Sequence, residues 1–222
     1  MIQAVIFDLD GTLVDSFEDI AHAANHALTS LGHEERSFAE IKSHVGHGLR
    51  NLLSGLVSEA NSEEIDRMME LVKSYYMDHP TDFTTTYPGA SEMLDRLAEL
   101  GIQTGVLSNK LDSLVQKIGV DLGFADKMGA VWGHREGFPL KPDPTSLLAI
   151  LAEMGVSPAE CLVVGDASPD RLLARNAGTQ FCGVTFGMTD RSGWEAEGVD
   201  WCVDSLEEIA ELTETIAAGR TD

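Results

Sequence analysis

The sequence predicts an α/β protein with a doubly wound, Rossmann-like parallel sheet and an inserted all-helical domain. A short apolar run with strand character opens the chain, and a long stretch with helical periodicity follows it directly. From Pro88 onward, short apolar runs alternate with helical patterns, which is typical of a parallel sheet covered by helices on both faces. We therefore expect residues 1–15 and 83–222 to form an α/β core and residues 16–82 to form a helical cap.

The first predicted strand, Ala4–Phe7, ends at two aspartates. The run is too short for a helix and is rich in β-branched and aromatic residues, as buried strands are. Asp8 and Asp10 lie two positions apart, so an extended backbone would project both carboxylates to the same side. Gly11 and Thr12 follow, at a turn where exposed backbone N–H groups can meet an anion.

This pair of carboxylates needs a counterion. Two carboxylates so close cannot both stay ionised near neutral pH unless a cation lies beside them or one pKa is raised. Mg²⁺ fits, because it binds through one or two carboxylates together with phosphate oxygens. An Asp-x-Asp tripeptide in an exposed loop would need no ion, but this one follows a buried strand and precedes Gly-Thr. The sequence therefore predicts a Mg²⁺ site beside an anion-binding turn.

Residues 16–82 carry apolar positions at helical spacing. Two longer helices are predicted at residues 20–31 and 65–80, with shorter helices at residues 41–45 and 49–56 between them. This insert follows the first strand directly and is joined to the core by two segments. We expect it to act as a lid that rotates over the active site and sets substrate choice.

The remaining elements alternate along the chain. Residues 217–222 are expected to form a frayed tail. Helices are predicted at residues 93–100, 111–118, 144–154, 171–176 and 206–216, and strands at residues 104–107, 130–132, 161–164, 181–185 and 201–203.

Polar residues follow several of these strands, where a doubly wound sheet binds its ligands. Ser108-Asn109 and Asp166 come directly after predicted strands, and Lys141 lies in a loop before a helix. Each has an ordinary alternative: Ser108 can cap a helix, Lys141 can be a surface lysine, and Asp166 and Asp170 can stabilise a helix N-terminus. The order of these residues along the chain favours one shared site, because each is expected to face the same crevice.

These residues also carry a family resemblance. The segment DLDGTLVDS at residues 8–16 resembles the first motif of the haloacid dehalogenase superfamily of phosphohydrolases. Ser108, Lys141 and the segment GDASPD at residues 165–170 fit the three later motifs in order. Relatives often have Ser directly after the first Asp of the last motif, where this chain has Ala167, but both aspartates are in place.

The resemblance implies a phosphomonoester hydrolase that works through an aspartyl phosphate. Asp8 would be the nucleophile and Asp10 the general acid and base. Mg²⁺ would be held by Asp8, the backbone carbonyl of Asp10, and Asp166. The phosphoryl oxygens would be bound by Thr12, Ser108, Asn109 and the catalytic Lys141, with Asp170 orienting Lys141 or a metal-bound water.

Other functions remain open at this point. A phosphosugar mutase similar to β-phosphoglucomutase would share the core residues and differ mainly in the cap. A phospho-accepting switch like a receiver domain also combines acids, Ser/Thr and Lys around Mg²⁺, but such domains are shorter and lack the helical insert. A catalytically inactive relative would keep the fold. The dehalogenase members of the superfamily do not need the second aspartate, which disfavours dehalogenation here.

The cap contains one candidate substrate contact, the segment HVGHGLRNLL at residues 44–53. It is similar to the cap motif of phosphoglycolate phosphatases within the superfamily, which suggests 2-phosphoglycolate as the substrate. Gly46 and Gly48 would give a flexible loop before a helix, and Arg50 could clamp the substrate carboxylate. The alternative for Arg50 is an exposed helix arginine.

Composition limits the partners. The formal charge of −22 over 222 residues argues against nucleic acids and anionic membranes, so a small phosphorylated metabolite is the expected partner. Three widely spaced cysteines, Cys161, Cys182 and Cys202, suggest buried thiols in a reducing compartment. Asp8 lies too near the first residue for a cleavable leader to precede it, so we expect a cytoplasmic protein. The oligomeric state is left open.

Overall fold

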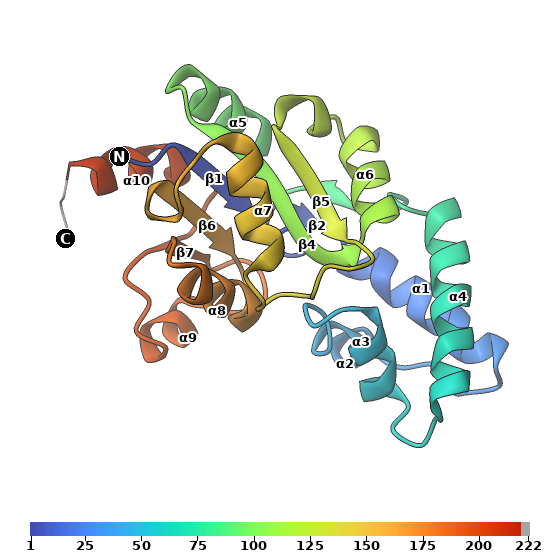
Figure 1. The fold of residues 1–222 in the computed structure, drawn as a ribbon. Coiled ribbons are helices and arrows are strands. Elements are labelled where there is room, and N and C mark those ends of the chain that lie inside the picture. The colour runs from blue at the N-terminus through green and yellow to red at the C-terminus, as the bar shows by residue number, and fades with distance from the viewer. Residues whose placement is uncertain (219–222) are drawn as a thin grey trace.

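A computed structural model describes residues 1–218 of the chain and has the predicted α/β architecture. Within these residues, a six-stranded sheet has the order β5-β4-β1-β6-β7-β8, and every neighbouring pair is parallel (Figure 1). The strands are β1 (Ala4–Phe7), β4 (Gln103–Leu111), β5 (Ala130–His134), β6 (Cys161–Gly165), β7 (Gln180–Val184) and β8 (Cys202–Val203).

Strand β1 lies in the middle of the sheet and is fully buried, as its apolar sequence predicts. Its alternate residues contribute to two hydrophobic cores: Val5 and Phe7 to one, Ala4 and Ile6 to the other. The first core includes α5 (Ala90–Glu99), α6 (Asp112–Asp121) and α10 (Glu208–Ala217), and the second includes α7 (Thr145–Met154) and α8 (Ser168–Ala177). Helices therefore cover both faces of the sheet.

The helices inserted after β1 have a hydrophobic core of their own. That core also includes Leu114 of α6, and Figure 1 shows the four helices gathered at one end of the sheet, beside β4 and α6. The division at residues 16 and 83 into cap and catalytic core stays a prediction. The inserted helices are α1 (Phe17–Ser30), α2 (Phe38–Lys42), α3 (Leu49–Leu56) and α4 (Ser62–Asp78).

The two connections between the insert and the sheet run side by side. Strand β2 (Val14–Asp15) pairs antiparallel with β3 (Thr85–Thr86), a ribbon that the sequence analysis did not predict. Just beyond it, the buried Asp19 carboxylate accepts the backbone N–H groups of Phe83 and Thr84, at 3.1 and 2.8 Å, and the Thr84 hydroxyl at 2.5 Å. One carboxylate thus holds the outgoing and returning segments together.

Several boundaries differ from the predicted ones. Strand β4 extends to Leu111, so the predicted helix at residues 111–118 begins one residue later, and the strand register shifts between Leu107 and Leu111. Helix α9 (Arg191–Ala196) was not predicted; its buried Trp194 donates its indole N–H to the Val184 carbonyl at 2.9 Å. Ala217 ends α10 and is not part of a frayed tail, and residues 219–222 of that predicted tail lie outside the described residues.

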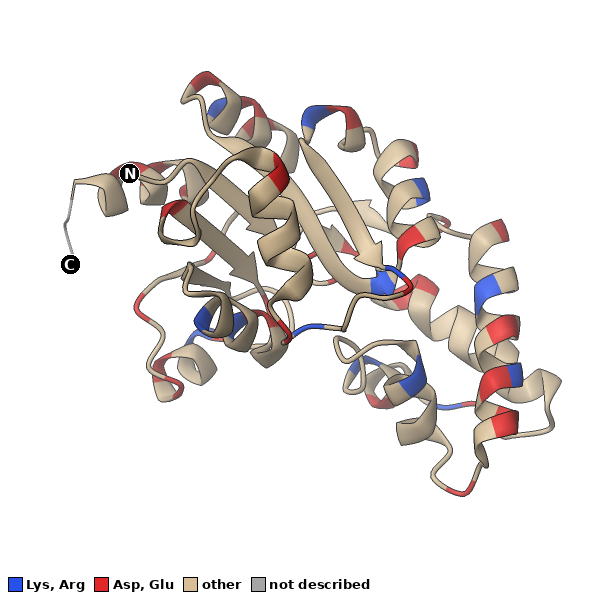
Figure 2. Cartoon of the chain, viewed as in Figure 1, with Lys and Arg blue, Asp and Glu red and all other residues tan. Residues whose placement is uncertain are grey.

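Charge is distributed over both parts of the molecule. Figure 2 shows acidic residues on helices and loops around the sheet and on the inserted helices, with basic residues interspersed along α4. A strong negative charge spread in this way favours solubility. Among residues 1–218, no helix combines the length and the apolar composition that crossing a membrane requires.

The hydrogen bonds of the Asp19 carboxylate, called here the Asp19 clamp, should stabilise the folded protein. We expect Asp19→Ala to lower the free energy of unfolding by about 2–3 kcal/mol, because it leaves the N–H of Thr84 and its buried hydroxyl without their acceptor. The control is Asp82→Ala, which removes an exposed carboxylate paired with His79 and should cost less than about 0.5 kcal/mol. Urea titration followed by circular dichroism measures both; equal small losses would show that the clamp adds little stability.

Candidate active site

Asp8 lies at the carboxyl end of β1 with its side chain almost completely buried. Its Oδ1 accepts the backbone N–H of Leu9 at 2.6 Å and lies 2.8 Å from Nζ of Lys141. Burial and then the neighbouring Asp170 carboxylate raise the pKa of Asp8 to about 7, while Lys141 acts in the opposite direction. The Leu9 N–H and Lys141 thus hold the Asp8 carboxyl group in place, but they compensate its negative charge only in part.

Lys141 joins two carboxylates that come from distant parts of the chain. Besides Asp8, its ammonium contacts Oδ1 of Asp170 at 2.7 Å, and its side chain is only 3% exposed. Burial alone would lower the pKa of Lys141, but the charges of Asp170 and Asp8 raise it above its usual range. Asp170 lies in the first turn of α8, where its Oδ2 accepts the Ala167 N–H at 3.2 Å. Lys141 therefore lies in a loop, as predicted, and is a buried ion-pair partner and not a surface lysine.

Asp166 follows β6 and completes the group of carboxylates. Its Oδ2 accepts the backbone N–H of Met188 at 2.9 Å. Burial, followed by repulsion from Asp8 and Asp170, raises its pKa well above the usual range. Gly11 has φ of +84°, and a side chain there would place its Cβ 2.2 Å from Oδ2 of Asp166. Glycine at this turn thus lets the backbone after β1 approach the carboxylate.

The buried acids fit a divalent metal ion. Ligand oxygens of Asp8, Asp166 and Asp170 all lie within 4.8 Å of one another. Three carboxyl groups face one ammonium, and the raised pKa values of Asp8 and Asp166 indicate that this ammonium does not fully compensate their charges. Oxygen donors suit a hard cation, which would supply the missing positive charge. The predicted metal set was Asp8, Asp10 and Asp166 with Asp170 behind it; the side-chain cluster contains Asp170 and not the Asp10 carboxylate. The contribution predicted for Asp10 was its backbone carbonyl, which stays a prediction.

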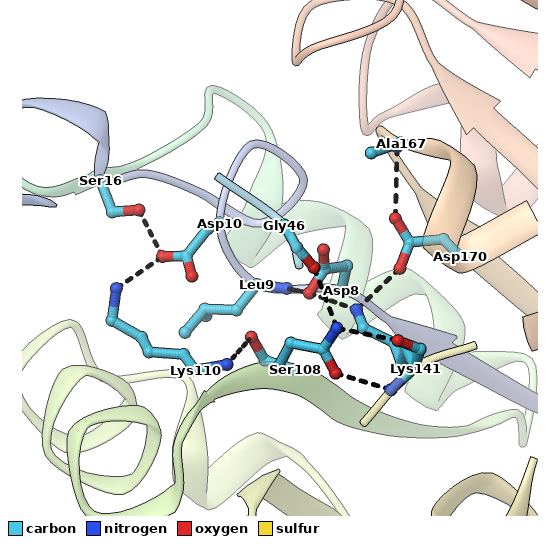
Figure 3. A network of polar contacts seen from close by, with 11 residues as sticks. Asp8, Leu9, Asp10, Ser16, Gly46, Ser108, Lys110, Lys141, Ala167 and Asp170 are labelled. Carbon is cyan, nitrogen blue, oxygen red and sulfur yellow. Dashed lines mark hydrogen bonds and ion pairs between the residues drawn. The ribbon is translucent and has the colours of Figure 1, made fainter. Parts of the chain in front are cut away.

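The two aspartates of the first motif belong to different polar networks. Figure 3 shows the Asp8 side chain beside Lys141 and the Asp10 side chain beside Lys110 and Ser16. Oδ1 of Asp10 accepts the Lys110 ammonium at 2.8 Å and also the Ser16 hydroxyl. Both aspartates still line one pocket. The two acids thus share one pocket, and each is paired with its own lysine.

The irregular end of β4 contributes the second motif. Ser108 is buried, and its Oγ accepts the Lys110 backbone N–H at 3.2 Å. The Asn109 side chain accepts the Lys141 N–H at 2.7 Å and donates to the carbonyls of Lys141, at 3.2 Å, and of Gly46, at 2.9 Å. One amide therefore fixes the backbone at Lys141 and contacts the inserted loop.

Thr12 and the loop glycines also lie at the site. Thr12, in the turn after Asp10, is fully buried, and among residues 1–218 its hydroxyl oxygen has no hydrogen-bond partner. Gly46 and Gly48 line the pocket, and their contact with a substrate stays a prediction. Gly48 has φ of +87°, and a Cβ there would lie 2.8 Å from Cδ1 of Leu140. The loop before α3 thus rests on the loop that carries Lys141.

A pocket of about 70 Å³ lies between the inserted helices and the sheet. Its floor is polar and includes Asp8, Asp10, Ser108 and Asn109, whereas the side formed by the inserted helices is mainly apolar. The apolar and aromatic residues that line it are Ile20, Ala24, Val45, Leu49, Leu52, Val72, Tyr76, Leu111 and Leu114.

Arg50 does not lie in the pocket, where a contact with the substrate would require it. It is not among the pocket residues, and its guanidinium pairs with Asp66 of α4. About half of each of these two side chains is exposed to solvent. The structure therefore places Arg50 on the outer surface of the inserted helices, as the alternative of an exposed helix arginine describes.

Sequence reasoning missed Lys110 and Tyr76, which both line the pocket. The Lys110 ammonium contacts Oδ1 of Asp10 and the Tyr76 hydroxyl, each at 2.8 Å. The one available signal was the position of Lys110 directly after Ser108-Asn109, at the end of a strand. Its partners lie 100 and 34 residues away in the chain, so sequence spacing gives no indication of the pairing.

The chain is similar to known proteins over most of its length. The family model for haloacid dehalogenase-like hydrolases matches residues 5–184. The chain is 36% identical over 218 residues to a phosphoglycolate phosphatase of Neisseria meningitidis, covering 95% of this chain and 93% of the relative. A phosphoglycolate phosphatase of Chromobacterium violaceum is 34% identical over 216 residues, covering 95% and 96%.

The fold is also similar to that of a solved structure. The crystal structure of a predicted phosphoglycolate phosphatase from Haemophilus somnus superimposes with a TM-score of 0.88 at 26% sequence identity. The match covers 96% of this chain and 98% of that one. The similarity thus extends over the sheet and the inserted helices alike.

The raised pKa of Asp8 predicts how stability depends on pH in metal-free protein. A carboxyl whose pKa is about 7 when folded and 3.8 otherwise contributes stability below about pH 4 that is lost as pH rises towards 7. We expect Asp8→Asn to remove this loss, and to be more stable than the unsubstituted protein by about 1–3 kcal/mol at pH 8 in EDTA. The difference should shrink towards pH 5.

Denaturant titrations at both pH values measure this difference. Asp200→Asn, at an exposed position, is the control and should change stability by less than about 0.5 kcal/mol at either pH. A metal-free Asp8→Asn protein that is less stable at pH 8 would show that Lys141 fully compensates the Asp8 charge.

Proposed function

The chain belongs to the haloacid dehalogenase-like hydrolase family, and on that premise we propose that it is a Mg²⁺-dependent phosphatase acting on 2-phosphoglycolate through an aspartyl phosphate. The observation that carries this proposal is the buried Asp8 carboxylate, which lines a small pocket and lies beside Lys141 and two further acids. The relatives named phosphoglycolate phosphatase support the choice of substrate.

In the proposed first step, Asp8 attacks phosphorus. Its Oδ1 is engaged by the Leu9 N–H and by Lys141, so Oδ2 is the oxygen that forms the new bond. The P–O bond to the substrate alcohol breaks in line with this attack, and a proton on Asp10 passes to the departing alkoxide. Ser108, Thr12, Lys141 and the Asn109 backbone bind the phosphoryl oxygens.

In the second step, water hydrolyses the aspartyl phosphate. The Asp10 carboxylate accepts the proton of the attacking water, the Asp8–phosphorus bond breaks, and inorganic phosphate leaves. The contacts of Asp10 with Lys110 and Ser16 both involve Oδ1, which makes Oδ2 the oxygen that carries the proton. The enzyme then returns to its starting protonation state.

Mg²⁺ would be held by Asp8, Asp166 and the Asp10 carbonyl, near Asp170. When bound, it supplies positive charge that offsets the repulsion between Asp8 and the substrate phosphate. The three neighbouring carboxyl groups, whose charges Lys141 does not fully compensate, support this role. Residues 16–82 would act as the cap, because the pocket lies between them and the sheet.

The size of the pocket supports a small substrate. About 70 Å³ holds on the order of five water-sized spheres, which is closer to a two-carbon acid than to a hexose. The apolar cap side likewise offers few hydrogen bonds to a sugar. A phosphosugar mutase would also have to return the phosphoryl group to its substrate, so release of inorganic phosphate separates the two functions.

The nucleophile and the substrate are tested together. We expect 2-phosphoglycolate to be hydrolysed with a higher kcat/KM than glucose phosphates, with phosphate released, and we expect Asp8→Asn to abolish turnover while the protein stays folded. Phosphate release is measured over a panel of phosphomonoesters. Activity of the Asp8→Asn protein above a few per cent would contradict the nucleophile, and interconversion of sugar phosphates without phosphate release would favour the mutase.

The metal is tested by exchange. EDTA should inactivate the enzyme and Mg²⁺ should restore it, whereas Ca²⁺ should not, because Ca²⁺ takes more ligands in a looser geometry than in-line transfer needs. Binding is followed separately by the thermal midpoint at pH 8, which Mg²⁺ should raise in the unsubstituted protein and raise less in Asp166→Asn. Full activity with Ca²⁺ would argue against an octahedral site.

A further inference from the structure

Lys110 lies at the end of β4 with its side chain only 7% exposed. Its ammonium contacts Oδ1 of Asp10 at 2.8 Å and the Tyr76 hydroxyl at 2.8 Å, and it lies 4.3 Å from the centroid of the Tyr76 ring. Asp10 and Lys110 belong to the sheet side of the site and Tyr76 to α4 of the insert. Lys110 therefore lies where the two sides of the pocket meet.

The residues that line the pocket all belong to the described part of the chain, and among them Lys110 is the one with a cationic side chain. Lys141 lies between Asp8 and Asp170 at the phosphoryl end of the site. Arg50 pairs with Asp66 outside the pocket. In a chain with a formal charge of −22, a second anionic group on the substrate needs a local cation, and Lys110 supplies it.

The hydrogen-bond capacity of Lys110 is not exhausted. An ammonium has three donors, and within residues 1–218 two acceptors contact this one. The Asp10 carboxylate and the Tyr76 hydroxyl hold the ammonium in place at the edge of the pocket. One donor of a charged group thus remains for a ligand in the pocket.

We infer that Lys110 binds the carboxylate of the substrate while the phosphate group lies at Asp8, and that it is the residue that selects a phosphorylated acid. This inference rests on the proposed function and names the residue that recognises the substrate. The surrounding apolar side chains strengthen a charge-assisted bond, and a carboxylate elsewhere on that apolar surface would lose its hydration without compensation.

A competing role must be separated from this one, because Lys110 also contacts the proposed general acid. If Lys110 acted only by positioning Asp10, its loss would slow every substrate alike. The ratio of kcat/KM for 2-phosphoglycolate to kcat/KM for ethyl phosphate removes that effect, since both esters use Asp10 and only one carries a carboxylate. The ratio is therefore the decisive measurement, with Mg²⁺ present throughout.

We expect Lys110→Met to lower this ratio by roughly 10- to 150-fold, the loss typical of a charge-assisted hydrogen bond. Most of the selective loss should appear in KM for 2-phosphoglycolate. An unchanged ratio, with both rates reduced, would overturn the inference and leave Lys110 as a positioning residue. A wild-type ratio near one would overturn both the proposed substrate and this inference.

Two control variants sharpen the result. Arg50→Ala removes the exposed cation of the cap, and Tyr76→Phe removes one partner of Lys110 while leaving its charge in place. Both should keep the ratio of the unsubstituted enzyme. If Arg50→Ala lowers the ratio and Lys110→Met does not, Arg50 is the carboxylate contact and the inference is wrong.

A binding measurement covers the case in which a buried lysine cannot be replaced without loss of activity. In the Asp8→Asn background, calorimetry compares the affinities for 2-phosphoglycolate and for inorganic phosphate, with and without Lys110→Gln. We expect the second substitution to weaken only 2-phosphoglycolate. Equal weakening of both ligands, in a protein whose melting curve remains cooperative, would overturn the inference.

Discussion

The site depends on one ammonium group held among three buried carboxylates. Lys141 contacts Asp8 and Asp170, and Asp166 completes the cluster. These residues come from the end of β1, the loop before α7, the end of β6 and the first turn of α8. A parallel sheet brings such positions to one edge, so the topology provides the site. Burying this much like charge opposes folding, and the hydrophobic layers on both faces of the sheet offset it.

The Asp-x-Asp sequence gives two acids in two environments. Asp8 is bound to Lys141 and is destabilised by neighbouring acids, whereas Asp10 is bound to Lys110 and Ser16. In the proposed mechanism these environments correspond to different tasks, attack on phosphorus and transfer of a proton. Each acid is thus paired with a separate lysine, although Leu9 alone separates them in sequence.

Much of this arrangement could be predicted from the sequence, and the rest could not for physical reasons. The buried first strand, the helical insert and the convergence of Asp8, Ser108 and Asp166 followed from periodicity and from the geometry of parallel sheets. The place of Lys141 beside Asp8 followed from the family resemblance. The ion pair of Lys110 could not, because it depends on how α4 packs against the end of β4. The cap motif suggested that Arg50 contacts the substrate, but its side chain pairs with Asp66 on a neighbouring helix. The spacing of residues in the sequence does not reveal this pair.

The Asn109 amide limits how far the insert can be exchanged. It donates to the Gly46 carbonyl and to the Lys141 carbonyl, and its oxygen accepts the Lys141 N–H. A chimera that receives a helical insert from another hydrolase must therefore present a backbone acceptor at the position of Gly46. Otherwise the graft would disturb the loop that carries Lys141, even with every residue of the sheet unchanged. The side-chain amide of Asn109 thus restricts which helical inserts can replace the present one.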